Sequence, residues 1–158
     1  MVSSREIKSL ITNFIKSSKI LSIATNTNQK PWIANVFFVS DESLNLYFLS
    51  SKESSHAKHI VKNPNAAVSI YDHSSDIGSN VKGVQIFGKV VRLKNLKEII
   101  RSLNLYLKRF PNAKKIDPLS LIEKGLESGF YKFIPNKFKF LDESMKEKYG
   151  VKQLELTL

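Results

Sequence analysis

Apolar residues at the start of the chain recur three and four positions apart, which is the spacing of one face of an α-helix. They are Ile7, Leu10, Ile11, Phe14 and Ile15. Ser3 and Glu6 have the spacing of a capping box, in which a hydroxyl and a carboxylate satisfy the free N–H groups of a helix start. The pattern predicts an N-terminal helix with one face on the core.

After this helix the pattern changes to short runs rich in β-branched and aromatic residues, bounded by polar turns. These runs predict strands at residues 20–25, 31–40, 44–49, 66–71, 83–93, 129–134 and 137–141. The first three are separated only by the polar segments 26–30 and 41–43, so they are expected to form an antiparallel meander.

Further helices are expected at residues 54–62, after the N-cap residue Asn95, and at residues 119–126, with a polar loop at residues 72–80. Strands that follow one another in hairpin order, with few long crossovers, favour an antiparallel barrel over a doubly wound sheet. The sequence therefore predicts a mainly β (α+β) fold. It is expected to be one domain over residues 1–158, an antiparallel barrel with peripheral helices.

The predicted strand at residues 32–39 is apolar on both faces. A barrel strand that turns one face to water should be polar on that side. We therefore expect the second face to be covered by a flat cofactor or by a second subunit, which predicts a homodimer.

Composition narrows the class of protein. The chain has no cysteine, no apolar run of the roughly 20 residues that span a bilayer, and no hydrophobic signal core at its start. A cytoplasmic protein without membrane attachment is expected.

The net charge is +11, and residues 82–115 are strongly basic, so this segment attracts anions unless it is only a solvated surface. Nucleic-acid binding through Lys94, Lys97, Arg101 and Lys108 is one option. It is disfavoured because Tyr106 and Phe110, the aromatic residues of the basic helix and its end, form no recognisable stacking platform, so only weak, non-specific binding is expected.

No motif for nucleophilic or phosphoryl-transfer catalysis is present, and no catalytic residue can be named. His56 and His59 lie three positions apart, but only Asp72 and His73 offer further ligands nearby in the sequence, so a metal site is not favoured. Residues 50–58 combine hydroxyls and cations at the start of a predicted helix, where free N–H groups and the helix dipole suit a phosphate. Ordinary N-capping by Ser54 is the simpler alternative.

In order and spacing, several segments resemble the flavin mononucleotide (FMN)-binding split β-barrels of the pyridoxamine 5′-phosphate oxidase-like superfamily. They are residues 20–25, 31–39, 46–52, 54–60, 63–70 and 83–90. Residues 108–113 and 140–142, the latter followed by a basic tail, are similar to the YhbP-like branch.

The resemblance implies a homodimer with FMN at the subunit interface. Asn35, Val36 and Phe37 are then expected to line the isoalloxazine ring, and Ser50 and Ser51 to meet the phosphate. Gln85 is expected near the cofactor.

Relatives usually carry an arginine and a lysine on the phosphate where this chain has Ser55 and His56. Lys52 and Lys58 are expected to supply part of the missing charge.

The resemblance favours an FMN-dependent oxidoreductase that acts on a small molecule, with no side chain required as an acid or base. Residues 137–158 have no counterpart of the oxidase's substrate-phosphate motif, so vitamin B6 oxidation is not expected. The departures at Ser55 and His56 favour the alternative of a flavin-free binding or sensing dimer.

Overall fold

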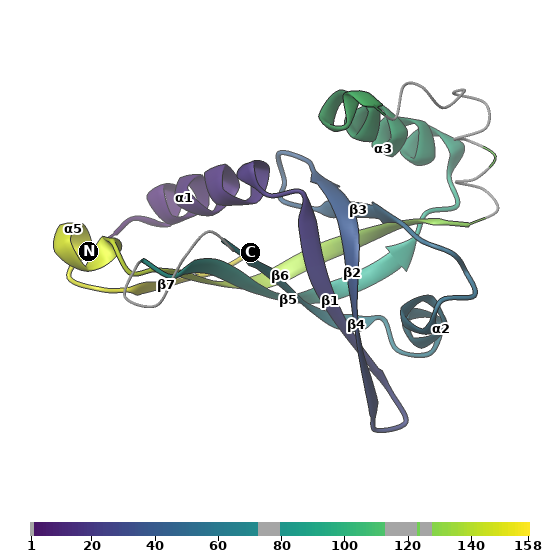
Figure 1. The fold of residues 1–158 in the computed structure, drawn as a ribbon, viewed down its shortest axis with the longest axis horizontal. Coiled ribbons are helices and arrows are strands. Elements are labelled where there is room, and N and C mark those ends of the chain that lie inside the picture. The colour runs from purple at the N-terminus through teal and green to yellow at the C-terminus, as the bar shows by residue number, and fades with distance from the viewer. Residues whose placement is uncertain (1, 73–79, 113–122, 124–127) are drawn as a thin grey trace.

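The computed structural model describes residues 2–72, 80–112, 123 and 128–158. In this part of the chain, seven strands form one sheet, and every paired neighbour is antiparallel. The strands are β1 (Ile20–Thr27), β2 (Lys30–Ser40), β3 (Leu46–Leu49), β4 (Asn65–Tyr71), β5 (Lys82–Arg92), β6 (Phe130–Asp142) and β7 (Gln153–Thr157). Their order is β3-β2-β1-β4-β5-β6-β7, and β3 also pairs with β6, so β1 to β6 close a barrel (Figure 1). The predicted antiparallel split β-barrel is confirmed.

The helices lie around this barrel (Figure 1). They are α1 (Ser4–Ser17), α2 (Ser55–Lys62), α3 (Leu96–Arg109) and α5 (Met145–Tyr149). The N-terminal helix begins as predicted, since the Ser3 hydroxyl accepts a hydrogen bond from the N–H of Glu6 at 3.2 Å. No helix among the described residues is both long enough and apolar enough to cross a membrane.

The barrel core is built from the inward positions of the strands and from one face of each of α1 and α2. Its largest fully buried side chains include Phe38, Phe48, Tyr131, Phe133, Phe138 and Phe140. A second, smaller cluster lies under α3, where Ile99 and Leu103 pack with Val39 of β2. Val39 is therefore buried on the outer face of β2 by a helix of the same chain.

The two last predicted strands, residues 129–134 and 137–141, are a single strand, β6. Pro135 was expected to separate them, because proline has no N–H to donate to a sheet. In the structure Pro135 lies opposite Gly88, where the β5–β6 register shifts and leaves Asn136 as an extra residue. A bulge at this point accommodates the proline.

The C-terminal segment contains two elements that the sequence did not predict, α5 and β7. Strand β7 has only five residues and buries Leu154 and Leu156 against the barrel. The predicted helix at residues 119–126 and the centre of the predicted loop at residues 72–80 lie outside the described residues.

Candidate functional site

The outer face of β1, β2, β4 and β5 carries two cross-strand rows of side chains, because residues paired across antiparallel strands share one face. The first row is apolar and consists of Ile33, Ala24, Ala67 and Phe87. The second row is polar and consists of Asn35, Ser22, Ser69 and Gln85. A shallow groove of about 440 Å³ runs along these rows.

The apolar row is unusually exposed for large side chains. Ile33 is 65% exposed and Phe87 is 51% exposed. Between them lie Ala24 and Ala67, whose side chains are single methyl groups that project little from the sheet. On the same face of β2, Phe37 is 57% exposed. This face is therefore flat and apolar along one edge, which suits a planar ring or another protein surface.

The polar row supplies hydrogen-bonding groups beside the apolar one. The Ser22 hydroxyl donates to the side-chain oxygen of Asn35 at 2.7 Å, which holds the Asn35 amide in place. Gln85 lies opposite Ser69 on the neighbouring strand. A ligand on this face would thus meet the oriented amide of Asn35 and the exposed amide of Gln85 along one side.

Strand alternation separates the three β2 residues that the resemblance had placed together. Asn35 and Phe37 point outward, whereas Val36 points inward and packs against the core. The Val36 side chain therefore cannot line the same surface as its neighbours. Phe37 is also held by α3, because the Tyr106 hydroxyl donates to its carbonyl oxygen and its ring meets the ring of Phe110 edge-on.

The start of α2 holds a second group of predicted residues. The Ser50 hydroxyl lies 2.7 Å from Nε2 of His56, and the Ser54 hydroxyl lies 3.3 Å from the same nitrogen. Ser54 also caps the helix by accepting the N–H of Ala57. The His56 side chain is only 6% exposed, so it does not face solvent. Its hydrogen bond instead holds the Ser50 hydroxyl in place.

The cations of this region lie at the surface. Lys52 is exposed, and Lys58 forms an exposed ion pair with Glu53 at 3.0 Å. Ser51 and Ser55 are exposed as well. In the described part of the chain, the N–H groups of Ser55 and His56 have no partner, as expected for the first turn of a helix.

Burial lowers the pKa of the His56 imidazole, and the nearby His59 acts in the same direction. In the unfolded chain a histidine titrates near pH 6.5, so on acidification the unfolded state takes up a proton before the folded state does. The free energy of unfolding should therefore fall as the pH drops through about 6.5 towards the lower pKa of folded His56. In H56Q this fall should be smaller, which urea unfolding between about pH 7 and pH 5 measures. An equal fall in both proteins would contradict the prediction.

The sequence interpretation missed Ser22, Ser69 and Phe87 as members of the outer face. Strand alternation was the available signal, because each lies an even number of residues from another outward residue of its strand. Among the described residues no group of three or more histidine, cysteine, aspartate or glutamate side chains is placed to hold a metal ion.

Comparison with known proteins places this architecture in a family. Residues 7–132 match the model of the family described as pyridoxamine 5′-phosphate oxidase. A curated relative, the UPF0306 protein YE0465 of Yersinia enterocolitica, is 30% identical over 108 residues, which cover 68% of this chain and 72% of the relative.

Solved structures agree on the fold. A FAD-binding protein from Mesorhizobium loti matches with a TM-score of 0.63 and 15% identity, over 80% of this chain and 88% of that one. HutZ, a heme storage protein from Vibrio cholerae, matches with a TM-score of 0.65 and 16% identity, over 81% of this chain and 89% of that one. The chain belongs to the pyridoxamine 5′-phosphate oxidase family and, within it, to the UPF0306 (YhbP-like) proteins, whose structural neighbours include flavin- and heme-binding proteins.

Proposed function

We propose that this protein is an FMN-dependent oxidoreductase that acts on a small molecule. The observation that carries the proposal is the flat outer face of β1, β2, β4 and β5, which has apolar side chains beside the amides of Asn35 and Gln85 in a chain of this family. Asn35, Phe37 and Gln85 would contact the ring system there. Bound FMN would supply electron or hydride transfer, and the protein would supply binding and orientation.

The start of α2 offers hydrogen-bond donors that suit the phosphate of the cofactor. The free N–H groups of Ser55 and His56, the helix dipole and the hydroxyls of Ser50 and Ser51 together offer several donors. The charge is lower than in relatives, because Ser55 carries none and buried His56 is neutral at neutral pH. We therefore expect FMN to bind more weakly here than to a site with a bidentate arginine.

A second copy of the chain is the proposed cover of the outer face. Ile33, Phe37 and Phe87 expose large apolar side chains on one side of the sheet. Isologous dimers pair the same surface of both subunits, so one such patch is sufficient for both copies. The dimer would bury these side chains and enclose the ring system between the subunits.

A flavin-free binding or sensing dimer is the second candidate. It is favoured by His56, which is hydrogen-bonded to Ser50 and Ser54 in the core instead of facing a ligand.

The absorbance spectrum of freshly purified protein distinguishes the candidates. Bands near about 370 and 450 nm are expected from a bound flavin, whereas an intense Soret band would indicate heme, as the name of HutZ suggests for that relative. A colourless protein that takes up no added FMN would reject the flavin proposal.

Restoring the arginine of the relatives should strengthen FMN binding. S55R is expected to tighten it about tenfold, because a charge-assisted bidentate contact exceeds a hydroxyl hydrogen bond by roughly 1–2 kcal/mol. S50A should weaken it about fivefold, the usual net value of one hydrogen bond being about 1 kcal/mol. Quenching of FMN fluorescence measures both. S9R, on the exposed side of α1, adds the same charge elsewhere and should leave the affinity unchanged. Unchanged affinity in both S50A and S55R would place the phosphate somewhere other than the start of α2.

A further inference from the structure

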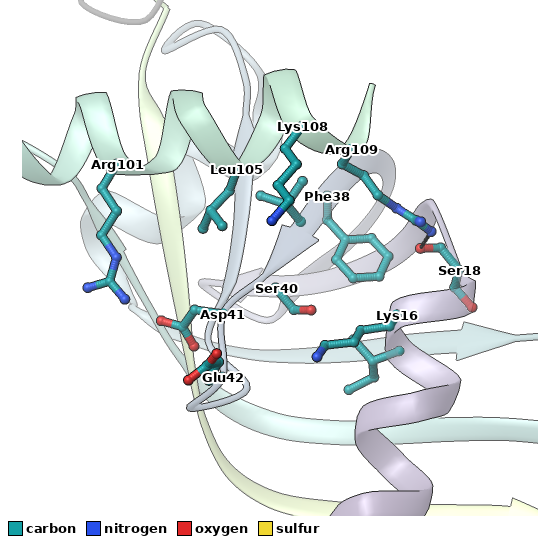
Figure 2. A pocket seen from close by; sticks show the side chains of 12 residues that line it. Lys16, Ser18, Phe38, Ser40, Asp41, Glu42, Arg101, Leu105, Lys108 and Arg109 are labelled. Atoms are coloured by element: carbon teal, nitrogen blue, oxygen red, sulfur yellow. Dashed lines mark hydrogen bonds between the residues drawn. The ribbon is translucent and has the colours of Figure 1, made fainter. Parts of the chain in front are cut away.

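A cleft of about 640 Å³ lies between the end of α1, the turn after β2 and the C-terminal half of α3 (Figure 2). It is separate from the outer face of the sheet and from the start of α2, because it shares no lining residue with either. Phe38 and Leu105 contribute apolar surface, and the remaining lining is largely polar or charged.

The charges around the cleft are unbalanced. Four basic residues line it against two acidic ones, a net charge of +2. Two of these six charges have structural roles. Asp41 is buried and accepts hydrogen bonds from Ser43, Asn45 and the Tyr47 hydroxyl, and Arg109 donates to the carbonyl oxygen of Ser18 at 3.1 Å. Of the other basic residues, Arg101 acts on the buried Tyr47 hydroxyl, where its charge opposes the rise of the Tyr47 pKa. Lys16 and Lys108 have no structural role within the described part of the chain.

Two of these cations converge in the cleft although they come from different helices. Figure 2 shows the amine of Lys16 on α1 and the amine of Lys108 on α3 pointing into the space beside Ser40. Neither lysine forms an ion pair or hydrogen bond within the described part of the chain. Two like charges that face one cavity repel each other, and an anion between them would remove that repulsion.

We propose that this cleft binds a small molecule through a phosphate or diphosphate group. The amines of Lys16 and Lys108 would flank the anion, the Ser40 hydroxyl would donate to it, and Arg101 would meet a second anionic group or the far end of a diphosphate. The apolar surface of Leu105 would contact the uncharged part of the ligand.

A small ligand fits this geometry better than nucleic acid does. Lys16 and Lys108 are solvent-exposed, but they reach into one cleft from two different helices, whereas a nucleic-acid backbone needs cations along one continuous outward-facing track. Exposed Lys97, on α3 and outside the cleft, is such an outward cation. Replacing Lys97 therefore tests whether binding depends on the cations of the cleft or only on positive charge at the surface.

The test is calorimetric titration of the full chain with pyrophosphate, at constant ionic strength set with chloride. The double variant K16Q/K108Q should bind pyrophosphate at least about tenfold more weakly, since about 1.4 kcal/mol per lost charged contact already corresponds to a factor of ten. The control K8Q/K97Q removes the same net charge from the same two helices outside the cleft and should bind as the unaltered protein does. Neither Lys16 nor Lys108 lies at the start of α2, so weaker binding in K16Q/K108Q separates this site from that one.

Three results would overturn the proposal. The first is that the unaltered protein takes up no pyrophosphate at millimolar concentration. The second is equal weakening in K16Q/K108Q and K8Q/K97Q, which would indicate a diffuse basic surface. The third is tight binding of a single-stranded oligonucleotide that K8Q/K97Q abolishes and K16Q/K108Q does not, which would indicate nucleic acid on the outer side of α3.

Discussion

Replacing Gly88 by alanine is expected to destabilise the protein by about 3 kcal/mol, the upper part of the usual range for overpacked cores. A Cβ atom at this position would lie 2.2 Å from the carbonyl oxygen of Ile134 and 2.8 Å from the ring of Phe133. Both are held in the barrel wall, and Phe133 is fully buried, so neither can move away without disturbing the core. The bulge that accommodates Pro135 depends on this close approach of β5 and β6.

Thermal and urea unfolding measure the effect of G88A. For a chain of this length a loss of about 3 kcal/mol lowers the Tm by roughly 6–12 °C. The control is G150A, since Gly150 has a φ of 70° but nothing within 4 Å of its added Cβ. Its cost should be only the left-handed backbone strain of an alanine, about 1 kcal/mol. A loss in G88A no larger than in G150A would mean that β5 and β6 are not this close.

The sequence predicted the first two-thirds of the fold well because its signals there are local and agree. Short runs rich in β-branched and aromatic residues, bounded by polar turns, mark β1, β2, β4 and β5, and Ser3 and Asn95 mark two helix starts. For the C-terminal third of the chain the prediction of strands was wrong, and the reasons are physical. Pro135 is normally a strand breaker and is accommodated only by a bulge against Gly88, a long-range contact without a local signal. Strand β7 is too short for its alternation to stand out.

The candidate site was predictable in part. The alternation of β2 indicates that Asn35 and Phe37 share a face, and the same rule would have excluded the Val36 side chain from it. The hydrogen bond between His56 and Ser50 was not predictable, because it depends on how α2 packs against the barrel and buries the His56 side chain. The cleft between α1 and α3 was not predictable either, since Lys16 and Lys108 meet only through the tertiary fold.

Replacing Ile33 by aspartate is expected to convert a dimer into a monomer. Ile33 is 65% exposed at the β2 end of the apolar row on the outer face, where the proposed second copy would bury it. A carboxylate without a partner in such an interface costs several kcal/mol to bury, so the dimer should weaken at least about a hundredfold. Light scattering at micromolar concentration should report about twice 18.0 kDa for the unaltered chain and 18.0 kDa for I33D.

The control for this prediction is V61D. Val61 is 83% exposed on α2 and lies away from the outer face, so its replacement exposes the same new charge without entering the interface. V61D should remain dimeric and unfold at nearly the temperature of the unaltered chain, because Val61 does not belong to the core. I33D should also fold, but it should unfold at a lower temperature because it lacks the stabilisation that dimer formation adds. If I33D stays dimeric, or if the unaltered chain is a monomer, the outer face is not the subunit interface. FMN would then have no enclosing surface there, and the site proposed between the subunits would be wrong.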